Sequence, residues 1–289
     1  MKNWTVHKSN IDKSVNFTLP FGDNHIETRY VRRNDDYFIV YLSSLNGCKH
    51  ACRFCHLTST NQTFSEPVNT DLYLEQAIRV FKYYDDVVDE QGPVKSVNFN
   101  WMAMGDCLSN KHFVDDTSSI LGCLSSLARS RGLSSKFNVS TIMPTDFKDS
   151  LLIDFKGLPV DFYYSLYSMN PVFRKRWIPK SKPVEQSLSM LSEWQKSQHR
   201  EVVLHWAFIK GENDSEKDVN DICDAVLKHD LKVRVNVVRY NPPNDKSQES
   251  SEIVINRNFE IITNRLSVES KIVPRVGNDV HAACGTFFS

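Results

Sequence analysis

The stretch GCKHACRFC at residues 47–55 places three cysteines on one short loop, Cys48, Cys52 and Cys55. Three thiolates at this spacing can bind three irons of a 4Fe-4S cluster and leave the fourth iron without a protein ligand. A zinc site is the alternative, because His50 and His56 could complete one. Zinc normally takes two separated pairs of ligands, however, and no second pair of fitting spacing follows. The spacing therefore favours an iron–sulfur cluster.

The same loop resembles the signature of the radical S-adenosylmethionine (SAM) enzymes, in which the unligated iron chelates the amino and carboxylate groups of SAM. The resemblance implies two cofactors, a 4Fe-4S cluster and SAM, and cleavage of SAM to a 5'-deoxyadenosyl radical. It also implies an electron donor such as flavodoxin or ferredoxin. The loop carries no information about the substrate.

The composition indicates a globular protein without a dominant charge. Among 289 residues, Lys and Arg together number 35 and Asp and Glu also number 35, so the formal net charge is zero. A neutral chain lacks the long-range field that gathers phosphates, but it can still carry local basic patches. A polar N-terminus and the lack of a long apolar run argue against a signal peptide or a membrane span. Cysteines concentrated on one loop suit a reducing compartment. We expect a soluble, cytoplasmic monomer.

Strands and helices alternate along most of the chain. The predicted strands are 15–19, 26–31, 37–42, 94–101, 137–141, 162–166, 202–208 and 233–238, and the predicted helices are 71–90, 112–131, 146–155, 184–196 and 215–229. Thr70 or Asp71 is the expected N-cap of the first helix. The alternation predicts an α/β fold with a parallel sheet and right-handed crossovers. We expect a partial (β/α)6 radical SAM barrel (residues 37–289) after a short antiparallel β extension (residues 1–36).

Polar and small residues gather where the predicted parallel strands end. They are Gly105 and Asp106, Ser140, Ser165 to Tyr167, and Asn236. Taken singly, each could instead have a structural role, as a turn residue, a cap or a buried amide with its hydrogen bonds satisfied. Ligands bind at the carboxyl ends of such strands, so four groups at one end of a barrel favour a binding site.

Longer motifs resemble the RlmN/Cfr family of radical SAM methylases, which methylate an adenine carbon in ribosomal RNA. AMGDCL at 103–108 is similar to the family's GMGEPL, VSTI at 139–142 to LSTS, and VNVVRYNP at 235–242 to INLIPxNP. SLY at 165–167, followed by Arg174, Ile178 and Pro179, is similar to SLH followed by RxxIxP. GNDVHAACGTF at 277–287 is similar to GDDxxAACGQL, the most specific of these matches.

The resemblance assigns roles to individual residues. The SAM-binding residues would be Gly105, Asp106, Ser140, Ser165, Leu166, Tyr167 and Asn236. Cys284 would carry a methyl group that is turned into a carbon radical and added to the adenine. Glu27, in the IETRY segment at 26–30, would be the acid–base group, because an aromatic carbon that gains a substituent must lose a proton. In a half-buried strand a carboxylate otherwise lies on the wet face.

Several positions depart from the family pattern. Tyr41 stands where the family has a second cysteine that releases the product through a disulfide, and a phenol cannot replace a thiol in that exchange. Cys107, next to Asp106, is our candidate for the missing thiol, because Cys123 and Cys223 lie in predicted helices where burial is expected. Asp106 replaces a glutamate and Tyr167 a histidine. The resemblance begins at about Asp12, so we expect no counterpart of the family's N-terminal helical domain, which helps grip RNA.

The sequence therefore predicts an enzyme that alkylates an sp2 carbon of an RNA base, in structured ribosomal or transfer RNA. The basic run at 174–177 with Lys180 and Lys182 could contact RNA, or it could be a solvated loop. Two alternatives remain open. One is a radical SAM enzyme of this lineage that acts on another substrate. The other is a non-catalytic nucleic-acid-binding protein with a structural zinc site.

Overall fold

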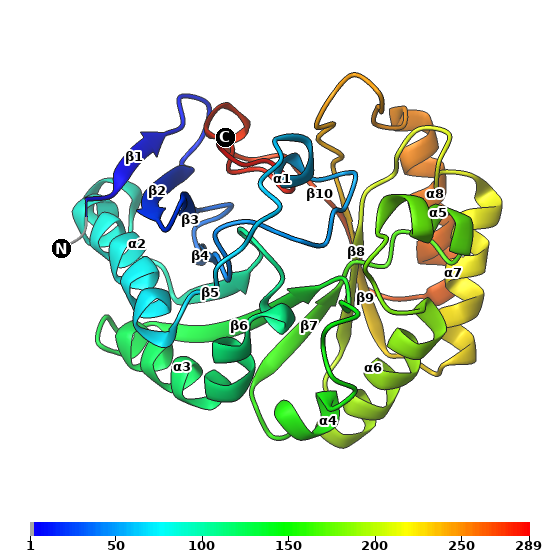
Figure 1. Cartoon of the computed structure of the whole chain (residues 1–289), viewed down its shortest axis with the longest axis horizontal. Helices are drawn as coiled ribbons and strands as arrows, with labels where there is room; N and C mark the ends of the chain where they lie inside the picture. Colours follow the sequence, from blue (N-terminus) through cyan, green and yellow to red (C-terminus); the bar gives the residue numbers. More distant parts are fainter. Residues whose placement is uncertain (1–2) are drawn as a thin grey trace.

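Ten strands form one sheet whose spatial order follows the chain, from β1 at one edge to β10 at the other. The computed structural model describes residues 3–289. The strands are β1 (Thr5–Lys8), β2 (Val15–Phe21), β3 (Asn24–Val31), β4 (Tyr37–Leu42), β5 (Ser96–Trp101), β6 (Ser134–Thr141), β7 (Val160–Tyr164), β8 (Val202–Trp206), β9 (Val233–Val238) and β10 (Ser270–Val273). The sheet curves around a central space, as Figure 1 shows.

The pairing of the strands divides the sheet into two parts. Strands β1 to β4 pair antiparallel, and β4 to β10 pair parallel. The predicted α/β partial barrel with an antiparallel extension is therefore confirmed. The expected boundary between residues 36 and 37 falls at the end of the loop that joins β3 to β4. These two strands pair with each other in the same sheet. The two-part division itself stays a prediction.

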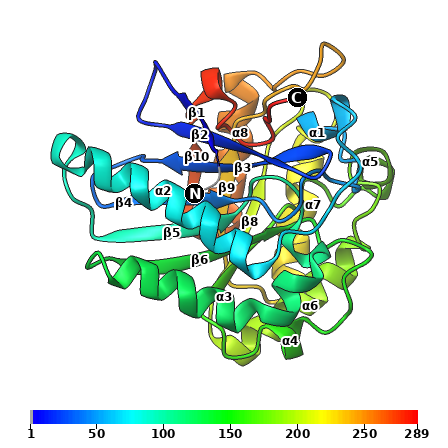
Figure 2. The same ribbon diagram turned by 60° about the vertical axis from the view of Figure 1, so that its left-hand side comes forward.

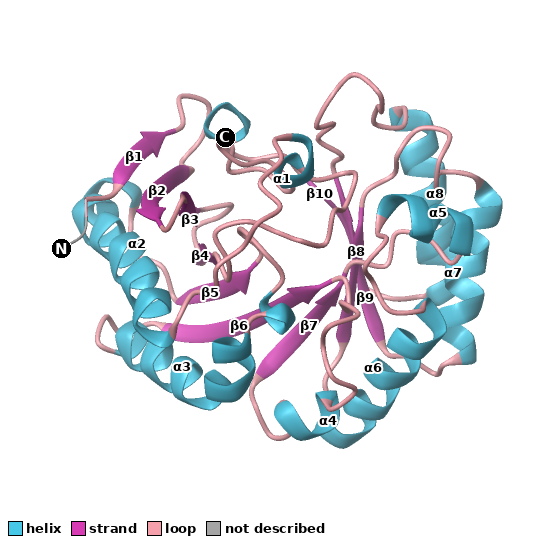
Figure 3. Cartoon of the chain, in the orientation of Figure 1, coloured by secondary structure: helices cyan, strands magenta, loops and turns pink. Residues whose placement is uncertain are grey.

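Helices cover the outer face of the sheet, as Figures 2 and 3 show. The helices of the chain are α1 (His56–Ser59), α2 (Thr70–Gln91), α3 (Lys111–Arg129), α4 (Leu151–Asp154), α5 (Pro171–Trp177), α6 (Val184–Gln198), α7 (Glu216–Lys228) and α8 (Glu252–Leu266), with short 3-10 turns η1 (Cys107–Ser109) and η2 (Asn278–Val280). Helix α1 is the exception to this arrangement, because it lies beside the C-terminal tail and not on the outer face. Aromatic side chains join the two layers. The Phe162 ring on β7 meets the Trp194 ring on α6 edge to face, with 4.8 Å between centroids.

Local chemistry explains where the first long helix begins and ends. The Asn69 side chain accepts a hydrogen bond from the Leu72 backbone N–H, so Asn69 is the N-cap and the prediction of Thr70 or Asp71 was wrong. Gly92 ends the helix with a positive φ of 82°, which a glycine adopts without steric cost.

Several further elements differ from the sequence prediction. Strands β1 and β10 and helices α1, α5 and α8 were not predicted. The predicted helix 146–155 shortens to α4, because the preceding segment pairs with the chain before α6 through a Thr145 N–H to Lys180 carbonyl bond of 2.9 Å. Within residues 3–289, no helix combines the length and the apolar composition that crossing a bilayer requires.

Candidate active site

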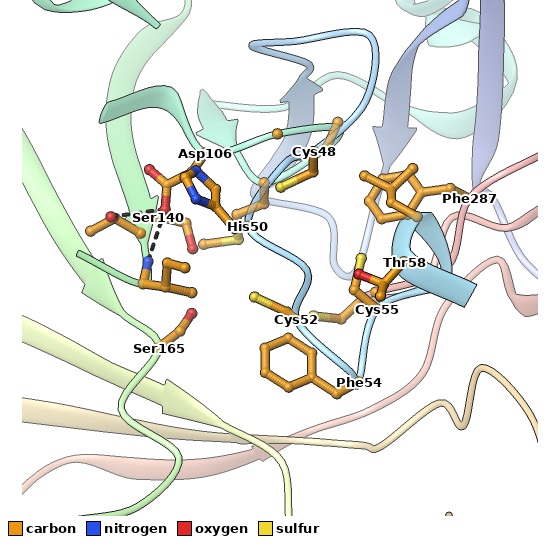
Figure 4. Close-up of a pocket in the computed structure, with 18 of the residues that line it drawn as sticks. Cys48, His50, Cys52, Phe54, Cys55, Thr58, Asp106, Ser140, Ser165 and Phe287 are labelled. Carbon is orange, nitrogen blue, oxygen red and sulfur yellow. Dashed lines mark hydrogen bonds between the residues drawn. The ribbon is translucent and has the colours of Figure 1, made fainter. Parts of the chain in front are cut away.

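The cysteine loop, residues 47–55, closes over a cavity at the carboxyl ends of the parallel strands. This cavity has a volume of about 130 Å³, and we call it the cysteine cavity. Figure 4 shows the sulfur atoms of Cys48, Cys52 and Cys55 around one common space. Within residues 3–289, no three His, Cys, Asp or Glu side chains converge tightly enough to hold one metal ion. The three thiols thus surround a volume rather than a point, which fits a multi-iron cluster.

Burial controls the protonation of these thiols. It raises the pKa of Cys48 and of Cys55 to about 12, and it raises the pKa of Cys52 well above its usual value. Desolvation acts this way because the thiolate loses its hydration in the cavity. A bound cationic cluster reverses the effect, since metal coordination deprotonates a thiol outright. The all-sulfur donor set therefore fits an iron–sulfur cluster.

Backbone contacts fix the cysteine loop in place. Gly47 passes so close to the Phe64 carbonyl oxygen that a Cβ atom would lie 2.2 Å from it, which excludes any larger residue there. The Arg53 N–H donates to the Trp177 carbonyl oxygen at 2.9 Å, which ties the loop to α5. The Phe54 ring stacks on the Tyr167 ring with 4.2 Å between centroids. The spacing of the cysteines predicts no role for Phe54.

Most of the predicted SAM-binding residues line the cysteine cavity. They are Gly105, Asp106, Ser140, Ser165 and Tyr167. Strand ends bring them together, because β5, β6 and β7 are parallel neighbours in the sheet. Gly105 has a φ of 81°, and a Cβ there would lie 2.7 Å from the Leu45 side chain. Its lack of a side chain thus lets the β5 end approach the loop.

Asp106 is held by the chain itself. Its Oδ2 atom accepts hydrogen bonds from the Thr141 hydroxyl and the Ile142 N–H, both at 2.9 Å, and its Oδ1 atom accepts one from the Leu108 N–H. Burial nevertheless raises the pKa of the Asp106 carboxyl. The side chain joins the ends of β5 and β6 at the cavity wall.

Two predicted SAM-binding residues lie outside the cysteine cavity. Leu166 is fully buried, and its carbonyl oxygen accepts a hydrogen bond from the Arg174 guanidinium at 2.7 Å. Asn236 lines a second cavity of about 280 Å³ on the inner face of the sheet, which we call the barrel cavity. Tyr41 also lines the barrel cavity, and Cys284 lines both cavities.

The C-terminal tail, residues 277–289, brings Cys284 to the boundary between the two cavities. The His56 N–H donates to the Gly285 carbonyl oxygen at 3.0 Å, and the Asn241 amide donates to the Cys284 carbonyl oxygen at 2.9 Å. Cys284 is an exposed residue, yet desolvation by the surrounding protein raises the pKa of its thiol. The Nε2 atom of His205 lies 3.9 Å from the Cys284 sulfur. His205 carried no motif in the sequence, so only the fold identifies it.

Glu27 lies in neither cavity. It is fully buried, and it accepts hydrogen bonds from the Asn16 amide at 2.9 Å, the Arg29 guanidinium at 2.9 Å and the Phe288 N–H at 2.7 Å. Burial alone would raise its pKa, but the charge of Arg29 and the hydrogen bonds of His25 and Asn16 outweigh burial and lower it. Arg29 in turn donates to the Ala283 and Thr286 carbonyls. As placed, Glu27 anchors the tail that carries Cys284.

We expect Glu27→Gln to loosen this tail. The change leaves the buried Arg29 cation unpaired, at a cost of about 3–5 kcal/mol in the free energy of unfolding. Because the folded-state pKa of Glu27 is lowered, its contribution is present above the unfolded value near 4.5 and is lost as the pH falls through the folded-state pKa. Urea unfolding and limited proteolysis of the tail measure both effects. Glu185→Gln, which removes a largely exposed carboxylate, is the control; an equal loss in both variants would contradict the anchor.

The structure corrects two other expectations. Cys107 is fully buried, contacts the Ser140 carbonyl oxygen and lines neither cavity, so its proposed role as the releasing thiol was wrong. Cys123 is exposed on α3 rather than buried, whereas Cys223 is buried as expected. In the basic run, Arg174 and Trp177 are buried, and the Trp177 indole donates to Glu212. The Trp177 carbonyl supports the cysteine loop, whereas Lys175, Arg176 and Lys180 are exposed, so a contact of this run with RNA stays a prediction.

Comparisons with known proteins agree with this geometry. A family model described as the radical SAM superfamily matches residues 42–223. The dual-specificity RNA methyltransferase RlmN of Vesicomyosocius okutanii is 26% identical over 95% of the chain and 74% of its own length. The probable dual-specificity RNA methyltransferase RlmN of Aquifex aeolicus is 23% identical over 94% of the chain and 75% of its own length. The crystal structure of a radical SAM methyltransferase from Sphaerobacter thermophilus has a TM-score of 0.81 at 21% identity, over 99% of this chain and 81% of that one.

Proposed function

The chain belongs to the radical SAM superfamily, and from this premise we propose that it methylates an adenine carbon in RNA. One observation carries the proposal: the tail holds Cys284 at the wall of the cavity that Cys48, Cys52 and Cys55 surround. A cysteine outside the cluster-binding set has no structural need to lie there. Relatives named as RNA methyltransferases match the chain over most of its length, which supports the substrate class.

In this proposal the residues of the cysteine cavity divide the work. Cys48, Cys52 and Cys55 would hold the cluster, and the residues that would bind SAM are Gly105, Asp106, Ser140, Ser165 and Tyr167, all of which line the cavity. When bound, the cluster and SAM together supply a 5'-deoxyadenosyl radical and a methyl group. The side chains of Leu57, Trp101 and Phe287 complete the wall. Their apolar surface excludes water, which would otherwise quench a reactive species.

His205 prepares Cys284 for methylation. Burial, with a smaller effect from Arg33, lowers the pKa of His205 to about 4, so the imidazole is neutral at physiological pH. A neutral imidazole at 3.9 Å can accept the Cys284 thiol proton at Nε2 when the sulfur attacks the methyl group of SAM. With SAM bound, the Cys284 sulfur would accept the methyl group while His205 takes up the thiol proton, and S-adenosylhomocysteine would be the leaving group.

We expect His205→Phe to slow methylation of Cys284 by about 10²- to 10⁴-fold, the usual contribution of a general base. Mass spectrometry of the tail peptide over time measures this rate at several pH values. The loss should shrink as the pH rises, because solvent then removes the thiol proton. His199→Phe, at the C-cap of α6, is the control. A loss that does not change with pH would indicate a structural role instead.

The methylation itself is tested with anaerobically reconstituted protein, SAM with a labelled methyl group, a reductant and total RNA from cells that lack the protein. Nucleosides from the digested RNA are then separated and weighed. We expect labelled methyladenosine.

A flavodoxin or ferredoxin should be able to replace the chemical reductant in this assay, and the active protein should be a monomer. Formation of 5'-deoxyadenosine without any labelled nucleoside would contradict the RNA substrate and would favour another acceptor.

A further inference from the structure

The barrel cavity has a polar wall, which is unusual for the inside of a barrel. Such interiors are normally filled by branched apolar side chains. Here neighbouring strands contribute two rows of polar residues in register. Tyr41, Asn100 and Asn138 are successive partners on β4, β5 and β6, and His205, Asn236 and Lys271 are successive partners on β8, β9 and β10. All six line the cavity, and Tyr163 lies between the two rows.

Part of this wall has hydrogen-bonding capacity that the chain leaves unused. The side-chain amide oxygen Oδ1 of Asn98 and the Nδ1 atom of His205 are buried without a hydrogen-bond partner among residues 3–289. His205 is only 9% exposed, so bulk water reaches it poorly. A buried polar atom without a partner costs about 1–3 kcal/mol. This cost is recovered when a polar ligand enters the cavity.

The charges on the wall have one sign. The charged side chains that line the cavity are Arg29, Arg33, Arg239, Lys271 and Arg275, and no carboxylate among the described residues lines it. Glu27 pairs with Arg29, and Glu249 pairs with Arg239 and Arg275.

Two cations on this wall remain without a carboxylate. Within residues 3–289, Arg33 and Lys271 form no ion pair, and the only hydrogen bond that the Arg33 side chain donates there is to the Pro274 carbonyl oxygen at 3.0 Å. Desolvation at the cavity wall, followed by the charge of Arg33, lowers the pKa of Lys271, although its side chain remains exposed. An anion near both would offset the effect of the Arg33 charge.

We propose that the barrel cavity binds a nucleotide, with its phosphate at Arg33 and Lys271 and its base against the amide and tyrosine side chains next to Cys284. A phosphate matches two cations that lack carboxylates. A base matches asparagine amides, which read its polar edge, and tyrosine rings, on which it can stack. The cavity opens onto Cys284, so a nucleotide held there presents its base to the proposed methyl carrier. The role given to Cys284 rests on the proposed function, but the binding itself does not.

The test measures binding to the cluster-loaded protein without reductant, by anaerobic calorimetry. The probes are adenosine, adenosine 5'-monophosphate and the trinucleotide ApApA. The double variant Arg33→Gln/Lys271→Gln should lose about tenfold or more in affinity for a phosphate-bearing probe, while its affinity for adenosine stays the same. The control Lys82→Gln/Arg129→Gln removes the same charge from exposed positions on α2 and α3, outside the sheet. Thermal unfolding of every variant checks the fold.

Each outcome decides the proposal. Loss of affinity for the monophosphate indicates a free nucleotide, and loss only for ApApA indicates a nucleotide within an RNA strand; both support it. Equal affinity of wild type and double variant for both probes, or an equal loss in the control, overturns it. The result is independent of methyl transfer. If the double variant binds nucleotides poorly but wild type methylates no RNA, nucleotide binding by the barrel cavity is supported, whereas the proposed RNA methylation is contradicted.

Discussion

Replacing Cys55 with alanine should abolish the iron–sulfur cluster and all formation of 5'-deoxyadenosine. The three thiols surround one cavity, and Cys55 supplies one third of the ligands, so two thiolates would be left to hold a cluster that already has an open iron. Reconstituted wild type should contain about four irons per chain and be brown. The variant should contain little iron and make no detectable 5'-deoxyadenosine from SAM and a reductant.

The matched control for this experiment is Cys123→Ala. Cys123 is exposed on α3, away from both cavities, so its loss should change neither the iron content nor the cleavage of SAM. Stoichiometric zinc in wild-type protein, with no uptake of iron under reconstitution, would contradict the cluster and revive the structural zinc site. Equal iron content in wild type and Cys55→Ala would show that other ligands hold the metal.

The second large effect is expected from Cys284→Ala. This variant should retain its cluster and its ability to cleave SAM, yet transfer no methyl group to RNA, because the sulfur that receives the methyl group is missing. The C-terminal peptide of wild type should gain the mass of one methyl group after incubation with SAM, and the variant peptide should not. The two cysteine variants therefore separate two steps, since Cys55→Ala loses both activities and Cys284→Ala only one.

Cys284→Ser provides the sterically matched control. A hydroxyl fills nearly the same space next to His205 but is a far weaker nucleophile at neutral pH, so the serine variant should be as inactive as the alanine variant. Methyl transfer to RNA by either variant would show that the methyl group does not pass through this position. An unmodified Cys284 in wild type under turnover conditions would point to the same conclusion.

Local sequence patterns were sufficient for most of the fold. The parallel strands alternate with helices whose apolar faces repeat at helical spacing, and the predicted strands 202–208 and 233–238 overlap β8 and β9. Strand β10 is different, because its four residues include the exposed Lys271 and show no clear alternation. It exists through its pairing with β9. Pairing between distant segments leaves no local signal in a sequence.

The residues of the candidate site likewise include some that the sequence predicted and some that it did not. Residues at strand ends were predictable, because the ends of parallel strands must meet at one edge, and Gly105, Ser140 and Ser165 do line one cavity. The role of Glu27 was not predictable from its motif, since that role depends on Phe288 and on Arg29, which reaches the tail. The burial of Cys107 depends on how the β6 end packs over it. His205 gained its significance only from its distance to Cys284.

The tail anchor also bears on the order in which the protein folds. The Arg29 side chain and the Ala283 carbonyl that it binds are separated by 254 positions in the chain, whereas the three cysteines lie within one strand-to-helix connection. Contacts between distant positions form slowly, because the chain must lose loop-closure entropy before the contact repays it. The cysteine loop is therefore expected to reach its shape early and the tail to dock late. During that interval the cavity stands open on the side where Cys284 will lie, which would give a cluster a wider route of delivery than the folded protein offers.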